Sequence, residues 1–320
     1  MKKIFIFCCV ALYSFALSSC DDMLKDELFV KYAYVVQNGW KEVNLELNNI
    51  GVMSLPITVG VNGTSFNNRD VAVKLALDPD TLADYNFNKY KNDEVLYYKQ
   101  INDEAIKFPE EVVIESGKES AVIQVTLDKS KIENQYADYV LPVCIASAEG
   151  YDPGPTKYTR SLMHLSFYND FSGSYGGSCK LWDQDKSGSL HERTISSKIL
   201  YGYSPNECYF YAGEYDRTNI MKDGYIVRLN WDPETGEVLM TSDNTDMRLT
   251  LIEPTTFKQV IINHATDDSK KIVTTTLFVN YSYLDASSSN VRTMVFKGTM
   301  TMTDMNVPVE RPGRVDTPTE

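Results

Sequence analysis

The chain has 320 residues, 43% of them hydrophobic, and a formal net charge of −13 at pH 7. This hydrophobic content is typical of globular proteins, and the length is sufficient for two domains of ordinary size. A strongly acidic chain repels nucleic acid and anionic membrane surfaces, because binding to phosphates requires clustered lysine and arginine. The composition therefore argues against a nucleic-acid-binding protein.

The N-terminus has the features of a secretory leader. Two lysines precede an apolar run at residues 4–12, which is too short to span a membrane. Residues 17–20, Leu-Ser-Ser-Cys, resemble a bacterial lipobox, in which Cys20 is acylated and becomes the first mature residue. Several acyl chains on one cysteine would anchor the protein stably. We predict a leader over residues 1–19 and lipidation at Cys20, which would take the net charge from −13 to −15.

Residues 20–40 are expected to be a tether between the lipid and the first domain. Asp21, Asp22, Asp26 and Glu27 make its start acidic, which resembles the surface-export signal of Bacteroidetes-type lipoproteins. The alternative is an ordinary solvated charge run. We expect a protein of the outer membrane that is held by its lipid anchor alone and faces the cell exterior.

Residues 41–169 are expected to form an immunoglobulin-like β-sandwich. Apolar and polar residues alternate at residues 43–47, which is the pattern of a strand with one buried face. Pro56 lies in the next apolar run and indicates an edge or a bulge. Asp78 and Pro79 are typical of a helix start, as N-cap and first helical residue. Short strands at this spacing predict an antiparallel sandwich.

Several stretches of this region resemble the N-terminal adhesin-like sandwich of Bacteroidetes surface lipoproteins. They are residues 78–86, the turn at 114–118, the strand that follows it to Leu127, and residues 139–143. The resemblance covers residues 28–165. It implies a protein encoded beside a SusC/SusD-like glycan-uptake pair, often with a second all-β domain. These motifs are structural, so they imply fold and context rather than chemistry.

Residues 170–307 are expected to form a second antiparallel β domain. Eight or nine strands without a helix predict a barrel or a second sandwich. Within it, residues 231–237 are typical of a hairpin, with Pro233 and Gly236 in turn positions. The proline-containing end, 308–320, is predicted to be a disordered tail.

The second domain contains a candidate glycan-binding face. Strand alternation at residues 208–215 places tyrosines on one side and small or apolar residues on the other. Such a face could stack against sugar rings. The alternative is that it packs inside a barrel or against the first domain, the commoner use of tyrosine in strands. The candidate ligand-binding residues are Trp182, Tyr201, Tyr203, Tyr209, Tyr211, Tyr215 and Trp231.

Residues 183–188 match the first six positions of a calcium loop. Asp183, Asp185 and Ser187 occupy the first three ligand positions, but Thr194 stands at position twelve, where a bidentate acid is needed. We therefore favour a strand-connecting hairpin loop and predict no metal, with those three residues as a weak candidate site.

The sequence gives little indication of catalysis. The three histidines, His164, His191 and His264, have no two-histidine metal spacing, and neither a nucleophile elbow nor a zinc-protease motif is present. A glycosidase needs only two carboxylates at a set separation, and sequence cannot select them among 44 acids. We expect no enzyme and no cofactor.

Three cysteines remain beyond Cys20 in the mature chain. Cys179 and Cys208 could form a disulfide in an oxidising space, or both could be small buried residues. The third is Cys144. The sequence does not decide between a Cys179–Cys208 disulfide and free thiols.

Together these features predict a lipid-anchored surface protein that binds a polysaccharide or a glycoprotein glycan without catalysis, as an accessory of a SusC/SusD-like complex. One alternative is an adhesin or structural module that contacts other surface proteins, and another is a glycan-active hydrolase. The sequence identifies neither the glycan nor the oligomeric state.

Overall fold

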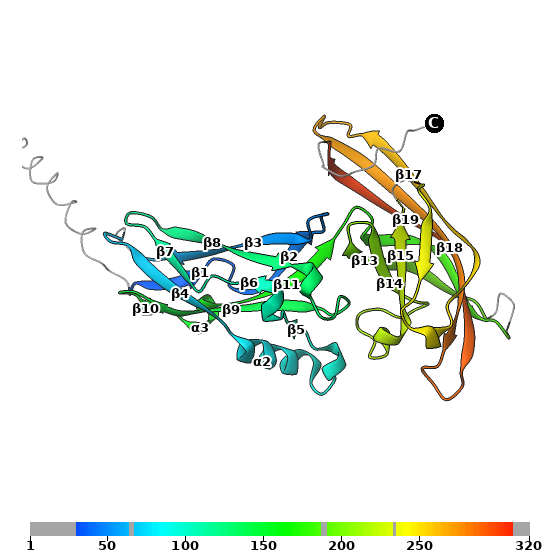
Figure 1. Ribbon diagram of the computed structural model, residues 1–320, viewed down its shortest axis with the longest axis horizontal. Coiled ribbons are helices and arrows are strands. Elements are labelled where there is room, and N and C mark those ends of the chain that lie inside the picture. The colour runs from blue at the N-terminus through cyan, green and yellow to red at the C-terminus, as the bar shows by residue number, and fades with distance from the viewer. Residues whose placement is uncertain (1–29, 64–66, 187–190, 233–234, 310–320) are drawn as a thin grey trace, which may run out of the picture.

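The structure, a computed structural model, describes residues 30–63, 67–186, 191–232 and 235–309. Within them the chain forms two all-β domains that lie side by side (Figure 1). The predicted leader, the lipidated Cys20 and the first half of the predicted tether fall outside the described residues. In the described ranges, the helices are all too short or too polar to cross a membrane.

The first domain is a sandwich of two β-sheets. One sheet has the strand order β10-β1-β3-β8-β6, and the other has the order β2-β11-β9-β4-β7, with β5 beside β9. The strands are β1 (Tyr32–Val35), β2 (Gly39–Glu46), β3 (Val52–Val61), β4 (Val71–Leu77), β5 (Lys99–Gln100), β6 (Ile106–Lys107), β7 (Glu111–Ile114), β8 (Ser120–Asp128), β9 (Tyr139–Ala148), β10 (Asp152–Pro153) and β11 (Arg160–Tyr168). The predicted sandwich is confirmed.

Helices in the described residues are few and short. The longest, α2 (Pro79–Tyr90), begins as predicted, because the Asp78 side chain accepts a hydrogen bond from the Thr81 amide at 3.2 Å. The others are α3 (Thr156–Thr159) and the 3-10 turns η1 (Glu94–Leu96), η2 (Asp103–Ala105), η3 (Lys129–Lys131), η4 (Lys222–Tyr225) and η5 (Thr245–Met247).

The predicted tether is too long at its C-terminal end. Residues 32–35 form β1, in which Ala33 and Val35 are fully buried in the sandwich core. β2 follows from Gly39. This end of the segment belongs to the fold because its two apolar side chains fill the core beside β3, to which β1 is hydrogen-bonded.

The second domain is one eight-stranded antiparallel sheet with the order β16-β15-β14-β13-β12-β19-β18-β17. The sheet curls until β16 and β17 come into contact, which makes a nearly closed barrel. The strands are β12 (Gly173–Asp183), β13 (Arg193–Ser204), β14 (Glu207–Tyr211), β15 (Ile226–Trp231), β16 (Val238–Thr241), β17 (Thr250–Asn263), β18 (Lys270–Asp285) and β19 (Arg292–Pro308). Pro308 was assigned to the disordered tail from the sequence, but it is the last residue of β19.

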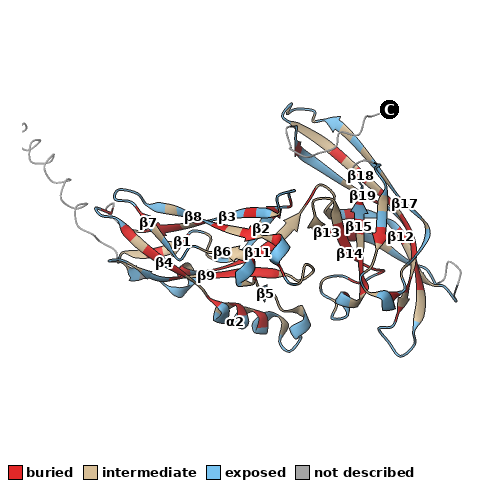
Figure 2. Ribbon diagram, in the orientation of Figure 1, coloured by how far each residue is buried: buried red, intermediate tan, exposed pale blue. Residues whose placement is uncertain are grey.

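Each domain has its own core, and buried positions alternate along the strands of both (Figure 2). The barrel interior is rich in aromatic rings. Phe210, Tyr281 and Phe296 are fully buried there, and the Tyr281 and Phe296 rings stack at 5.2 Å.

The link between the domains, residues 169–172, is tightly held. The Asn169 side-chain amide donates to the carbonyls of Ser204 and Glu207 at 2.7 and 2.8 Å, and its oxygen accepts from the Ser172 amide at 2.9 Å. Gly202 packs so closely that a Cβ there would lie 2.9 Å from the Phe167 carbonyl oxygen. These contacts fix the β13–β14 turn against the first domain.

Candidate ligand-binding cleft

The predicted tyrosine face does not form an open platform. Tyr209 and Tyr211 are each 2% exposed and Tyr215 is 8% exposed, which leaves no ring face for a sugar to stack on. Tyr209 is covered by the first domain, whose Tyr136 ring lies 5.1 Å from its ring, whereas Tyr215 stacks on Tyr225 of the second domain at 4.1 Å. Tyr136 also accepts a hydrogen bond from the Tyr209 hydroxyl through its carbonyl, at 3.4 Å. The structure thus shows the alternative, in which this face packs within the barrel and against the first domain, and not an open stacking face.

Tyr201 lies with the buried tyrosines, 5.2 Å from the Tyr209 ring and 5.9 Å from the Tyr211 ring, whereas the two tryptophans have other neighbours. Tyr203 packs on Tyr136 at 5.2 Å, while Tyr201 is half-buried under the Arg217 guanidinium, 3.8 Å from its ring centre. Trp231 is 3% exposed and stacks on Phe171 at 4.4 Å. Trp182 is half-buried on β12, beside β19. The structure thus brings together Tyr201, Tyr203, Tyr209 and Tyr211, but not the two tryptophans.

The weak calcium candidate lies in the connection between β12 and β13, which pair as antiparallel neighbours. The Asp183 carboxylate accepts from the Asp185 amide at 3.2 Å and pairs with Lys186 at 3.8 Å, while Ser187 lies outside the described residues. Within the described ranges, no three His, Cys, Asp or Glu side chains gather as metal ligands would.

Cys179 and Cys208 are both free and buried in the second domain. The Cys208 thiol donates to the Asn169 side-chain oxygen at 3.1 Å. Burial raises the pKa of Cys179 to about 11, so this thiol is protonated at neutral pH. The structure therefore favours the reading of these residues as small buried side chains.

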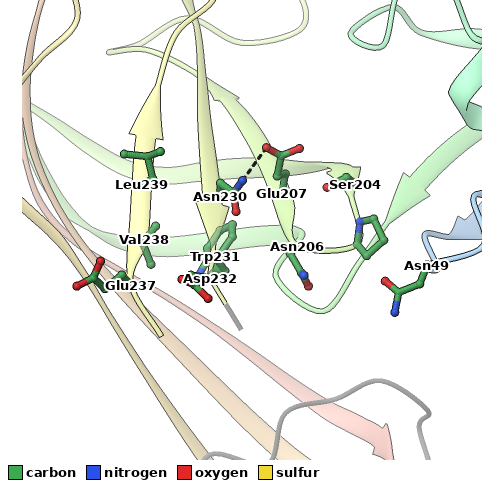
Figure 3. Close-up of a pocket in the computed structure, with 11 residues that line it drawn as sticks. Asn49, Ser204, Asn206, Glu207, Asn230, Trp231, Asp232, Glu237, Val238 and Leu239 are labelled. Carbon is green, nitrogen blue, oxygen red and sulfur yellow. Dashed lines mark hydrogen bonds between the residues drawn. The ribbon is translucent and has the colours of Figure 1, made fainter. Parts of the chain in front are cut away.

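A cleft of about 720 Å³ opens where the second domain meets a turn of the first (Figure 3). Turns and strand ends line it. They are Asn49 of the β2–β3 turn, the β13–β14 turn with Asn206 and Glu207, the end of β15 with Asn230 to Asp232, and the start of β16 with Glu237 to Leu239. We call this site the polar cleft.

Backbone hydrogen bonds hold the walls of the polar cleft. The Trp231 amide donates to the Asn206 carbonyl at 2.9 Å, and the Asp232 amide donates to the Glu237 carbonyl at 2.9 Å. The second bond closes the predicted hairpin, in which Gly236 adopts a positive φ of 73°.

The lining of the polar cleft suits a ligand rich in hydroxyl groups. The Asn230 amide donates to the Glu207 carboxylate at 3.0 Å, so the two side chains form one polar surface (Figure 3). The Trp231 indole N–H is buried, with no hydrogen-bond partner in the described part of the chain. The lining holds the acids Glu207, Asp232 and Glu237 and no basic residue, which disfavours an anionic ligand.

A charged network joins the domains beside the buried tyrosines. Asp138 of the first domain lies 2.8 Å from Arg217 and 3.9 Å from Lys222 of the second. Burial would raise the pKa of Asp138, but His164 and these two cations outweigh it and lower the pKa. Burial would lower the pKa of His164, but the Asp138 and Glu42 carboxylates on either side raise it.

The first domain carries an aromatic cluster that sequence reasoning missed. Trp40 stacks on Tyr85 at 4.5 Å and lies 4.8 Å from Tyr98. The Lys89 ammonium lies 4.7 Å from the Tyr98 ring centre and 5.5 Å from that of Trp40. These rings are half-buried and face one another and the lysine, so they are less available to a ligand than the walls of the polar cleft.

Sequence patterns gave one indication of the polar cleft, the hairpin at residues 231–237. The other lining residues stand in turns, where asparagine and acidic residues are common without any ligand. Their convergence depends on contacts between distant segments, as Asn49 and Asn206 show.

Comparisons with known proteins support the two-domain organisation. A family model for an N-terminal domain matches residues 27–152, and a family model for a C-terminal domain matches residues 159–301. A search of curated proteins gave no significant match.

Several solved structures of Bacteroides proteins share the fold. A protein of unknown function from Bacteroides ovatus is 21% identical, with a TM-score of 0.77 over 89% of this chain and 98% of its own. A multidomain protein from Bacteroides ovatus is 21% identical, with a TM-score of 0.76 over 88% and 98%. An auxiliary nutrient binding protein from Bacteroides thetaiotaomicron is 21% identical, with a TM-score of 0.71 over 83% and 91%. Through both of its domains, this chain thus has the fold of these two-domain Bacteroides proteins.

Proposed function

We propose that this protein is a non-catalytic, lipid-anchored surface protein that binds a neutral glycan in the polar cleft, as an accessory of a nutrient-uptake system. The observation that carries the proposal is the cleft itself, about 720 Å³ lined by amide and carboxylate groups. Ligand sites are typically concave, with a few convergent polar groups. The likeness in fold to an auxiliary nutrient binding protein supports the accessory role.

Affinity electrophoresis through gels that contain neutral plant and host polysaccharides tests the proposal. Purified residues 21–320 should be retarded by one of them, and Asn206→Ala combined with Asn230→Ala should remove the retardation. Asn88→Ala is the matched control, because Asn88 is an exposed amide on α2 of the other domain. Trp40→Ala tests the aromatic cluster as a competing site.

Each result has a distinct meaning. Retardation that survives in the cleft variant and disappears in Trp40→Ala would move the site to the first domain. No retardation by any polysaccharide would refute glycan binding and favour the adhesin alternative. Release of reducing ends from the retarding polysaccharide would refute the non-catalytic reading.

A further inference from the structure

A second, smaller pocket lies closer to the start of β13. It has a volume of about 190 Å³ and shares no lining residue with the polar cleft. Tyr201, Tyr211 and Tyr215 line it, together with Lys198 of β13 and two acids of the segment after β14. Three tyrosines of the predicted stacking face thus border a pocket rather than an open platform. We call it the lysine pocket.

Lys198 is an unusual residue for the wall of such a pocket. Its side chain is buried, with 7% of the residue exposed, and Nζ donates to the carbonyls of Tyr211 and Tyr215 at 2.8 and 3.0 Å. Its two hydrogen-bond partners in the described ranges are carbonyls, while Asp216 and Glu214 act on it only at longer range, so the ammonium has a third proton to donate. Burial lowers the pKa of Lys198 to about 8, so most of the side chain is still charged at neutral pH.

Tyr211 adds a second unsatisfied group. The residue is 2% exposed, and its hydroxyl has no hydrogen-bond partner in the part of the chain that the structure describes. A buried polar group without a partner is costly, and native structures contain few of them. A ligand oxygen in the pocket could accept a hydrogen bond from Lys198 or Tyr211.

The remaining lining defines the class of ligand. Glu214 and Asp216 offer carboxylate oxygens that accept hydrogen bonds from hydroxyl groups, while Tyr201 and Ile199 offer apolar surface. Glu214 pairs with Arg193, so the charges that remain in the lining are the Asp216 carboxylate and the Lys198 ammonium, which together disfavour both an anion and a cation. At about 30 Å³ for each water molecule, the volume equals roughly six waters, the size of a single small ring.

We propose that the lysine pocket binds one neutral pyranose ring, either a free sugar or a glycan chain end, with Lys198 and Tyr211 as its polar contacts. This site is independent of the polar cleft and would stand if the proposal for the cleft failed. It does not require a stacking platform, since hydrogen bonds from Lys198 and Tyr211 would hold the ring.

Titration of residues 21–320 by saturation-transfer NMR tests the proposal. The probes are D-glucose, D-galactose, D-mannose and N-acetyl-D-glucosamine, with D-glucuronate as the anionic counterpart. We expect at least one neutral sugar to bind saturably. Tyr211→Phe should weaken that binding about fivefold, the effect of one hydrogen bond, without lowering the melting temperature. Lys198→Met should abolish the binding, and Asn206→Ala in the polar cleft should leave it unchanged.

Three results would overturn the proposal. They are no saturable binding of any neutral sugar, tighter binding of glucuronate than of every neutral sugar, and full binding by a folded Tyr211→Phe variant. If Lys198→Met does not fold, Tyr211→Phe still decides, because it removes a single oxygen atom that has no hydrogen-bond partner among the described residues.

Discussion

Asp138→Asn is expected to weaken the junction between the domains. The Asp138 side chain is 12% exposed and forms ion pairs with Arg217 at 2.8 Å and Lys222 at 3.9 Å. Removal of one partner of a buried pair costs about 3–5 kcal/mol, because the remaining charge stays buried. Since the Arg217 side chain is 28% exposed and water can reach it, we expect a loss of about 2–3 kcal/mol in the free energy of unfolding.

Urea unfolding followed by tryptophan fluorescence and circular dichroism measures this loss. The matched control is Asp267→Asn, which removes a carboxylate paired with Lys270 at 2.9 Å on the exposed β17–β18 turn. Exposed pairs contribute little, so the control should change stability only slightly. A loss in Asp138→Asn no larger than that in the control would refute the reasoning.

The pH dependence follows from the two pKa shifts at this junction. The folded pKa of His164 is raised above 6.5, so its stabilising contribution is complete below pH 6.5 and is lost as the pH rises through the folded value. The pKa of Asp138 is lowered below 3.8, so its contribution is present above pH 3.8 and is lost as the pH falls through the folded value. The stability difference between wild type and Asp138→Asn should therefore be largest between about pH 4 and 6.5. Histidine proton NMR should show a lower His164 pKa in the variant.

Three further predictions concern other parts of the chain. Gly202→Ala should cost about 1–3 kcal/mol in the free energy of unfolding, because its Cβ would lie 2.9 Å from the Phe167 carbonyl oxygen; urea unfolding with Gly224→Ala as the control tests this. Asp78→Ala should cost about 1 kcal/mol through loss of the α2 N-cap, and a change below about 0.3 kcal/mol in urea unfolding would contradict it. Cys20→Ser should move the protein from the detergent phase to the aqueous phase in phase partitioning of cells that express it, and unchanged partitioning would refute lipidation at Cys20.

The fold could be predicted where it depends on local pattern. Strand alternation predicted both β domains, and the Asp78–Pro79 pair predicted the start of α2. The prediction failed at β1, whose four residues are too few for a clear alternation and which is held by β3 and β10.

The tyrosine face shows that local sequence pattern also fails to predict which side chains of a candidate site are exposed. Alternation correctly placed Tyr209 and Tyr211 on one side of β14, but it could not show what covers that side. The cover is Tyr136, which is 73 residues away from Tyr209 in the sequence and belongs to the other domain. A tyrosine that faces solvent and one that faces another domain have the same local sequence pattern.

The buried tyrosines and the polar cleft are two consequences of one junction. The tyrosine rings and the Asp138 ion pairs hold the domains together, while the Asn169 hydrogen bonds fix the β13–β14 turn. The same contact brings Asn49 of the first domain to the cleft whose other walls belong to the second. If ligand binding had to fix two mobile domains in position, their lost freedom of motion would lower the affinity. A rigid junction between the domains avoids this cost. Tyr136 and Tyr209 would then support binding in the polar cleft by positioning its walls rather than by touching the ligand there.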